Sequence, residues 1–124
     1  MTATGGFVTK AIHLINRRDG ANLHGMSRWD GNPQGFRSCC WRISDAEASE
    51  LTGGWVYFHE AKSSPSRFGG VILGFELGQG ELADRKVIQF RADHNARGVQ
   101  WRGADHGMAM WSGVVPAELP HEMT

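Results

Sequence analysis

Glycine constrains the fold of this chain more than any other feature of its sequence. Seventeen of the 124 residues are glycine, which is about twice the usual share of roughly 7%. Glycine adopts backbone conformations that other residues avoid, and it therefore concentrates in tight turns. The sequence thus predicts short strands joined by many turns.

The length and composition predict a single globular domain. A chain of 124 residues can bury one hydrophobic core, and its 40% hydrophobic and 21% charged residues are typical of a folded protein. Thirteen basic side chains balance thirteen acidic ones, which excludes a wholly basic nucleic-acid coat protein but leaves room for a local basic groove. We expect one domain over residues 1–124, with residues 116–124 as a frayed tail.

The sequence predicts a soluble, cytoplasmic protein with no membrane partner, no metal and no cofactor. No signal-like apolar segment follows the N-terminus, and no run approaches the roughly 20 apolar residues of a membrane span. Neighbouring residues do not readily reach relaxed disulfide geometry, so we expect Cys39 and Cys40 to be free, buried thiols in a reducing compartment. Zinc-ligand spacing, a phosphate-binding loop and a dinucleotide fingerprint are absent from the sequence.

Hydrophobic patterning predicts five or six short strands. The segments with alternating or branched apolar residues are 7–15, 55–60, 71–77 and 86–92, followed by shorter candidates at 98–102 and 108–115. Segments 55–60 and 71–77 form a predicted hairpin. Because alternating strand–helix units are missing, a doubly wound parallel fold is disfavoured, and we expect a mainly β structure with a small, strongly curved sheet or a partly closed barrel.

One helix is signalled by a capping box. Ser44 can cap the helix while Glu47 reaches back to the cap, and Gly53-Gly54 stops it after about two turns.

Residues 16–38 are rich in turn formers and predict a long ordered loop. Because long loops in compact domains are commonly functional, this one is a candidate rim for a pocket.

The first candidate site is His59-Glu60-Ala61-Lys62-Ser63-Ser64, at the end of the strand predicted at 55–60. Glu60 and Lys62 share one face of an extended chain and His59 points to the other. One interpretation is that Glu60 and Lys62 have no binding role and form an ion pair on the surface. Alternatively, the hydroxyl-rich turn that follows could bind a phosphate group or the carbonyl edge of a ligand.

Tryptophans beside polar residues form the second candidate site. Trp55 and Trp111 have strand positions that indicate core packing, whereas Trp29, Trp41 and Trp101 lie near turns. Indole faces stack on nucleobases, and arginine forks such as that of Arg102 bind phosphates.

A third cluster carries local positive charge between punctuating glycines. It contains Arg91, Asp93, His94, Asn95, Arg97, Arg102, Asp105 and His106. This composition is typical of a small electrostatic footprint for an anion.

The central block resembles the PUA-like superfamily, and within it the EVE and ASCH domains. The resemblance rests on Gly53-Gly54-Trp55-Val56-Tyr57-Phe58-His59, a polar turn, and Gly69-Gly70-Val71-Ile72-Leu73-Gly74-Phe75-Glu76. The predicted helix 44–51, which comes just before the first of these segments, is similar to the helix that precedes that strand in these families. The resemblance covers about 35 residues; the N-terminal motifs of EVE domains are absent. The resemblance implies a small PUA-like pseudobarrel with one or two short helices that binds RNA or DNA, often through a modified or flipped base.

These patterns predict a nucleic-acid or nucleotide-binding module with an aromatic pocket flanked by arginines. The predicted ligand-binding residues are Trp29, Trp41, His59, Lys62, Ser63, Ser64, Arg67, Arg97, Trp101 and Arg102. One alternative is a small hydrolase or ribonuclease in which Lys62 or His59 supplies acid–base chemistry and Glu60 orients it. Another is a protein-interaction or defence-related inhibitor module that uses the Trp29 loop as an anchor.

Overall fold

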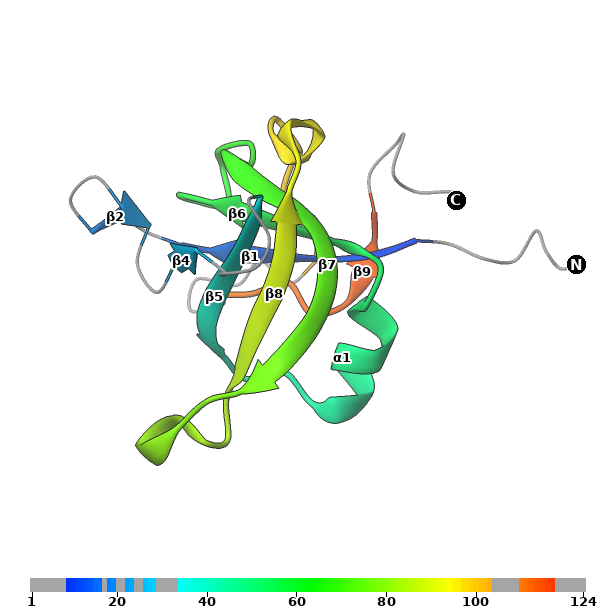
Figure 1. Cartoon of the computed structure of the whole chain (residues 1–124). Helices are drawn as coiled ribbons and strands as arrows, with labels where there is room; N and C mark the ends of the chain where they lie inside the picture. Colours follow the sequence, from blue (N-terminus) through cyan, green and yellow to red (C-terminus); the bar gives the residue numbers. More distant parts are fainter. Residues whose placement is uncertain are drawn as a thin grey trace, which may run out of the picture.

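The computed structural model of the chain describes residues 9–16, 18–19, 22–23, 26–28, 34–103 and 110–117 (Figure 1). Within them lie nine strands, one α-helix and two short 3₁₀ helices, η2 and η3. The elements are β1 (Lys10–Ile15), β2 (Arg18–Asp19), β3 (Asn22–Leu23), β4 (Met26–Arg28), β5 (Gly35–Trp41), α1 (Asp45–Leu51), β6 (Trp55–His59), β7 (Phe68–Leu77), η2 (Gly80–Leu82), β8 (Lys86–Ala92), η3 (His94–Ala96) and β9 (Val115–Pro116).

The predicted mainly β class is confirmed, with more strands than expected. Seven strands form one sheet in the order β4-β5-β8-β7-β6-β1-β9, and β2 pairs with β3 in a separate two-stranded ribbon. The sheet curves strongly, most visibly along β7 (Figure 1). Its edges β4 and β9 do not pair with each other, so the described strands form an open sheet and not a closed barrel.

The predicted hairpin and the strand at 86–92 are confirmed. β6 and β7 are antiparallel, with Trp55 opposite Val71 and Phe58 opposite Phe68. β8 then pairs antiparallel with both β7 and β5. β1 pairs in parallel with β6, a pairing of segments about 40 residues apart that strand patterning alone does not reveal.

Helix α1 begins and ends where its local signals indicate. The Ser44 hydroxyl accepts a hydrogen bond from the Glu47 backbone N–H at 3.1 Å, and the Ser44 backbone N–H donates to the Glu47 carboxylate at 3.0 Å. Past the C-terminus, Gly53 has φ of +87°, which favours glycine. Ala48 and Leu51 face inward and pack into the core beside β1 and β7.

The core divides between the two faces of the sheet because neighbouring strand residues point in opposite directions. Ile12, Leu14, Val56 and Phe58 join the larger cluster, which α1 covers and which extends to the phenylalanines of β5, β7 and β8. The opposite face of the same strands carries a smaller cluster that includes Ala11, Tyr57, Ala96, Val99 and Ala117. Both faces of β1 are therefore buried.

The start of β7 packs unusually close to its neighbours. A Cβ added to Gly69 would lie 2.1 Å from the Val56 carbonyl oxygen, and one added to Gly70 would lie 1.9 Å from that of Arg91. Both distances are far below van der Waals contact. Glycine is therefore required at these two positions for β6, β7 and β8 to approach as they do.

Three expectations about irregular segments are corrected. The segment read as one long loop, 16–38, contains β2, β3 and β4 and the start of β5, because its turn formers separate short strands that pair with each other or with β8. Residues 98–102 form no strand; the Gly98 and Val99 backbone N–H groups bond to Ser66 instead. In the segment expected to fray, Pro116 lies in β9, and Ala117 is fully buried and donates to the Thr9 carbonyl oxygen.

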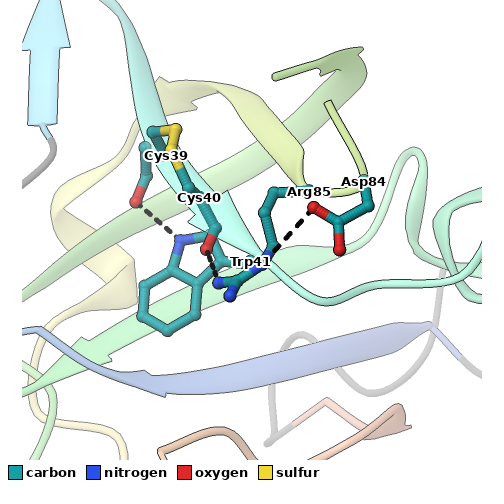
Figure 2. The surroundings of a disulfide bond; sticks show 6 residues. Cys39, Cys40, Trp41, Asp84 and Arg85 are labelled. Atoms are coloured by element: carbon teal, nitrogen blue, oxygen red, sulfur yellow. Dashed lines mark hydrogen bonds and ion pairs between the residues drawn. A yellow bond between two sulfur atoms is a disulfide. The ribbon is translucent and has the colours of Figure 1, made fainter. Parts of the chain in front are cut away.

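The expectation that Cys39 and Cys40 are free thiols is also corrected, because the two residues form a disulfide within β5 (Figure 2). The peptide bond between them is cis, and the residues are half-buried. The Cys40 carbonyl oxygen accepts a hydrogen bond from the Arg85 guanidinium at 3.2 Å. The register between β5 and β8 shifts over the same segment, between Ser38 and Trp41. In the described part of the chain, no helix has the length and apolar character needed to cross a membrane.

Two glycine substitutions within β7 test the close approach of the strands. We expect Gly70→Ala to lower the free energy of unfolding by about 3 kcal/mol, because its methyl group would overlap the Arg91 backbone. Gly74→Ala is the matched control, since its methyl group meets only the end of the Gln89 side chain at 3.2 Å, and it should cost less than about 1 kcal/mol. Urea unfolding measures both. Equal losses in the two variants would contradict this explanation.

Candidate functional site

A cleft of about 510 Å³ lies where β8 ends and η3 begins, a size typical of small-ligand sites. Phe36 and Phe68 form its aromatic part, with ring centroids 5.2 Å apart in an edge-to-face arrangement. Three exposed arginines, Arg28, Arg91 and Arg97, surround the rings. The cleft therefore combines aromatic surface with concentrated positive charge.

Separate elements bring the three arginines together. Arg28 ends the edge strand β4 opposite Phe36, and its guanidinium carbon lies 5.3 Å from the centroid of that ring, as in a cation–π contact. Arg91 comes from the end of β8 and Arg97 follows η3. Figure 1 shows the η3 turn in yellow beyond the tip of β8, at the end of the sheet away from α1.

Backbone contacts hold the polar side of the cleft, which Gln34, Asp93, His94 and Asn95 line. The Asp93 carboxylate accepts a hydrogen bond from the Asn95 backbone N–H at 2.9 Å and so caps η3. The Asp93 backbone N–H donates to the Gly69 carbonyl oxygen at 3.1 Å, and the Ala92 N–H donates to that of Gln34 at 2.9 Å. The turn is thereby fixed to the strands on either side.

The charges in the cleft are unbalanced. Among the described residues that line it, Asp93 is the only carboxylate, against three guanidinium groups. The side chains of Arg28, Arg91 and Arg97 form no ion pair with any carboxylate in the described ranges, whereas Arg37 and Arg67 on other surfaces do. Three guanidinium groups without a carboxylate partner around one cleft provide donors for an anionic ligand.

Among the predicted site residues, His59 and Trp101 come together at a different place. Their ring centroids are 5.2 Å apart in an edge-to-face arrangement, and the Lys62 ammonium lies 5.9 Å from the Trp101 ring centroid. His13, which the sequence did not single out for this role, lies in the same group, 5.7 Å from Trp101 between ring centroids. We name this group of His13, His59, Lys62 and Trp101 the histidine pair site.

The two histidines of the histidine pair site are fully buried and joined by a hydrogen bond. His59 Nδ1 lies 2.9 Å from the Ser64 carbonyl oxygen, which can only accept, so Nδ1 carries the hydrogen and Nε2 is the acceptor of the neutral ring. His13 Nδ1, 2.8 Å from His59 Nε2, must then be the donor. That leaves His13 Nε2 as a bare acceptor, and it has no hydrogen-bond partner in the described part of the chain.

Both rings are held neutral by their surroundings. Burial is the largest cause that lowers the pKa of His13 to about 3, and the nearby His59 and Arg102 lower it further. Burial also lowers the pKa of His59, although the hydrogen bond to the Ser64 carbonyl acts in the opposite direction. The pair is therefore a structural element of the β1–β6 junction that disfavours a proton.

The remaining predicted residues are dispersed. Glu60 pairs with Arg67 at 2.8 Å and is not paired with Lys62, and Ser63 is exposed. Arg102 Nη1 donates to the Pro116 carbonyl oxygen at 3.4 Å.

Trp41 lies on the other face of the sheet from Trp101. Its Nε1 donates to the Ser38 hydroxyl at 3.0 Å, and its ring packs against the cluster that contains Phe58. His59, the next residue in β6, points away from that cluster, toward Trp101. The structure therefore brings His59 and Trp101 together but places Trp41 apart from them. Trp29 lies outside the described residues.

Of the predicted ligand-binding residues that the structure describes, Arg97 alone lines the cleft. The third sequence cluster had indicated its neighbours Arg91, Asp93, His94 and Asn95 as an electrostatic footprint. Sequence reasoning missed Arg28, Gln34 and Phe68, and it assigned Phe36 no role in binding. Arg28, Phe36 and Phe68 come from β4, β5 and β7, and Gln34 directly precedes β5. The long-range pairing that places these segments beside the end of β8 leaves no local signal in the sequence.

Comparisons with models of protein families, with curated proteins and with solved structures gave no match to this chain. They lend no support to the resemblance to PUA-like domains, which stays a prediction from sequence. The site has to be interpreted from its own geometry.

The buried histidines predict a loss of stability in mild acid. The unfolded chain binds a proton near the ordinary histidine pKa of 6.5, whereas folded His13 resists it down to about 3. The contribution of His13 to the free energy of unfolding is therefore complete above pH 6.5. It declines as the pH falls below that value, by up to about 1.4 kcal/mol per pH unit. Urea unfolding between about pH 7 and pH 5 measures this slope.

Two asparagine variants identify the source of the slope. His13→Asn keeps a donor near the position of Nδ1 but cannot titrate, so the unfolding free energy should depend less steeply on pH, even if it is lower throughout. His94→Asn removes an exposed histidine and should keep the wild-type slope. An unchanged slope in His13→Asn would show that this ring is not responsible.

Proposed function

We propose that this protein binds single-stranded nucleic acid or a nucleotide in the cleft between β4, β5, β8 and η3. One observation carries the proposal: three arginines without a carboxylate partner among the described residues surround two phenylalanine rings in a cleft of about 510 Å³. The zero net charge of the chain does not oppose it, since the positive charge is local.

The chemistry of the cleft matches the two halves of a nucleotide. Guanidinium groups form forked hydrogen bonds with phosphate oxygens. Aromatic rings and arginine planes stack on bases, with about 1–3 kcal/mol per stacked base. Arg28 already lies over Phe36, so it can extend the stacking surface as well as supply charge.

The proposed site differs from the sequence-based one in its aromatic residues. Phenylalanines of β5 and β7 take the place expected for tryptophans, and Arg97 is shared by both versions. The sequence did indicate the combination of aromatic and arginine side chains. It did not indicate which of them lie together.

The structure gives less support to the alternatives. Hydrolysis by Lys62, His59 and Glu60 would need the three groups to face one substrate, but His59 is fully buried with both ring nitrogens engaged, and Glu60 is paired with Arg67. The interaction-module alternative depends on Trp29, outside the described residues. Neither alternative is favoured by an observation of its own.

Binding to labelled oligonucleotides tests the proposal. Fluorescence anisotropy with short single-stranded RNA and DNA should show saturable binding that weakens as salt increases, because phosphate binding releases counterions. Arg28→Gln, Arg91→Gln and Arg97→Gln should each weaken binding and reduce the salt slope by about 0.7 for each phosphate that is no longer neutralised. The triple variant should bind only weakly.

Arg42→Gln is the matched control. Arg42 follows β5 at its far end, is exposed and lies 3.9 Å from an Asp84 oxygen outside the cleft, so its loss should leave affinity and salt slope unchanged. Absence of binding to every oligonucleotide and mononucleotide would refute the proposal. An equal loss in the control and the cleft variants would refute this location.

A further inference from the structure

We propose that the cleft selects guanine among the bases, with the Asp93 carboxylate recognising the base edge; this inference rests on the nucleotide-binding function proposed above. Its starting point is the distribution of charge within the cleft. Asp93 forms no ion pair with any of the three arginines that line the same cleft. Positive and negative groups thus remain separately available to one ligand.

A cleft with two separate poles fits a ligand that is anionic at one end and donates hydrogen bonds at the other. Arginine forks suit the phosphate of a nucleotide. The carboxylate cannot bind phosphate, because like charges repel, so its place in the cleft favours contact with another part of the ligand. Gln34 and Asn95 line the same polar side.

The Asp93 carboxylate is held in place and keeps free acceptor capacity. It accepts one hydrogen bond, at 2.9 Å from the Asn95 backbone N–H, out of about four that an ionised carboxylate can accept. The backbone of the same residue is bound to Gly69 on β7. Little ordering entropy therefore has to be lost when a ligand binds this group.

The hydrogen-bonding edges of the four bases differ in how they meet a carboxylate. Guanine presents two adjacent donors, N1–H and the 2-amino group, which match two carboxylate oxygens. Adenine and cytosine place an acceptor nitrogen beside their amino group, and uracil flanks its single N–H with two carbonyl oxygens. Each of these three bases would bring a lone pair toward the negative charge, so Asp93 favours guanine and disfavours the others.

Competition by 5′-mononucleotides against a labelled oligonucleotide tests the inference. The wild-type protein should bind GMP at least about tenfold more tightly than AMP, CMP or UMP, the discrimination typical of one good bidentate base contact. IMP, which keeps N1–H but lacks the 2-amino group, should bind with an affinity between those of GMP and AMP.

Asp93→Asn separates base recognition from folding, because asparagine caps helices about as well as aspartate. This variant should lose most of the GMP preference while its affinity for UMP stays within about twofold or improves. Asp84→Asn removes an exposed carboxylate outside the cleft and should keep the preference. Circular dichroism verifies that both variants are folded.

The outcomes distinguish this inference from the function on which it rests. Binding of all four nucleotides with similar affinity by the wild-type protein would overturn guanine selection and leave the proposed nucleotide site intact. A GMP preference that survives Asp93→Asn, or an equal loss of every nucleotide in that variant, would overturn the role of Asp93. If no nucleotide or oligonucleotide binds to the wild-type protein, both proposals fail.

Discussion

The close approach of three backbones at the start of β7 supports the rest of the structure. Gly69 and Gly70 leave no room for a side chain against Val56 on one side and Arg91 on the other. Strands packed this closely bring the end of β8 beside the beginning of β7, and the Gly69 carbonyl oxygen then anchors the Asp93 backbone. The packing of the sheet therefore holds the part of the cleft wall that Arg91 and Asp93 line.

The two faces of the sheet carry different chemistry. The face covered by α1 is filled by aliphatic and phenylalanine side chains, and two of these phenylalanines continue to the rim, where they line the cleft. The other face buries the hydrogen-bonded histidines at the β1–β6 junction. Because burial lowers the pKa of both rings in the folded chain, the pair couples folding to pH.

Local signals in the sequence were sufficient for the elements whose causes are themselves local. The capping box from Ser44 to Glu47 predicted α1, and alternating apolar residues predicted β6, β7 and β8. Segment 16–38 was misread because turn formers say where a chain bends and not whether the residues between bends find a partner strand. The same limit applies to the candidate site. Tryptophan and arginine are suited to binding nucleotides, but residue type alone does not reveal that Trp41 and Trp101 lie on opposite faces of the sheet.

The sequence by itself determined the mainly β class, one capped helix and the local positive charge of the cluster that begins at Arg91. These depend on residue type, spacing and turn chemistry within a few residues of one another. Only the tertiary structure decided which side chains meet. Arg28, Phe36 and Phe68 come from three separate strands and Arg97 follows η3. The long-range pairing of β4, β5, β8 and β7, together with the docking of η3, brings them around one cleft. Such contacts depend on register and curvature, which arise when the whole sheet assembles.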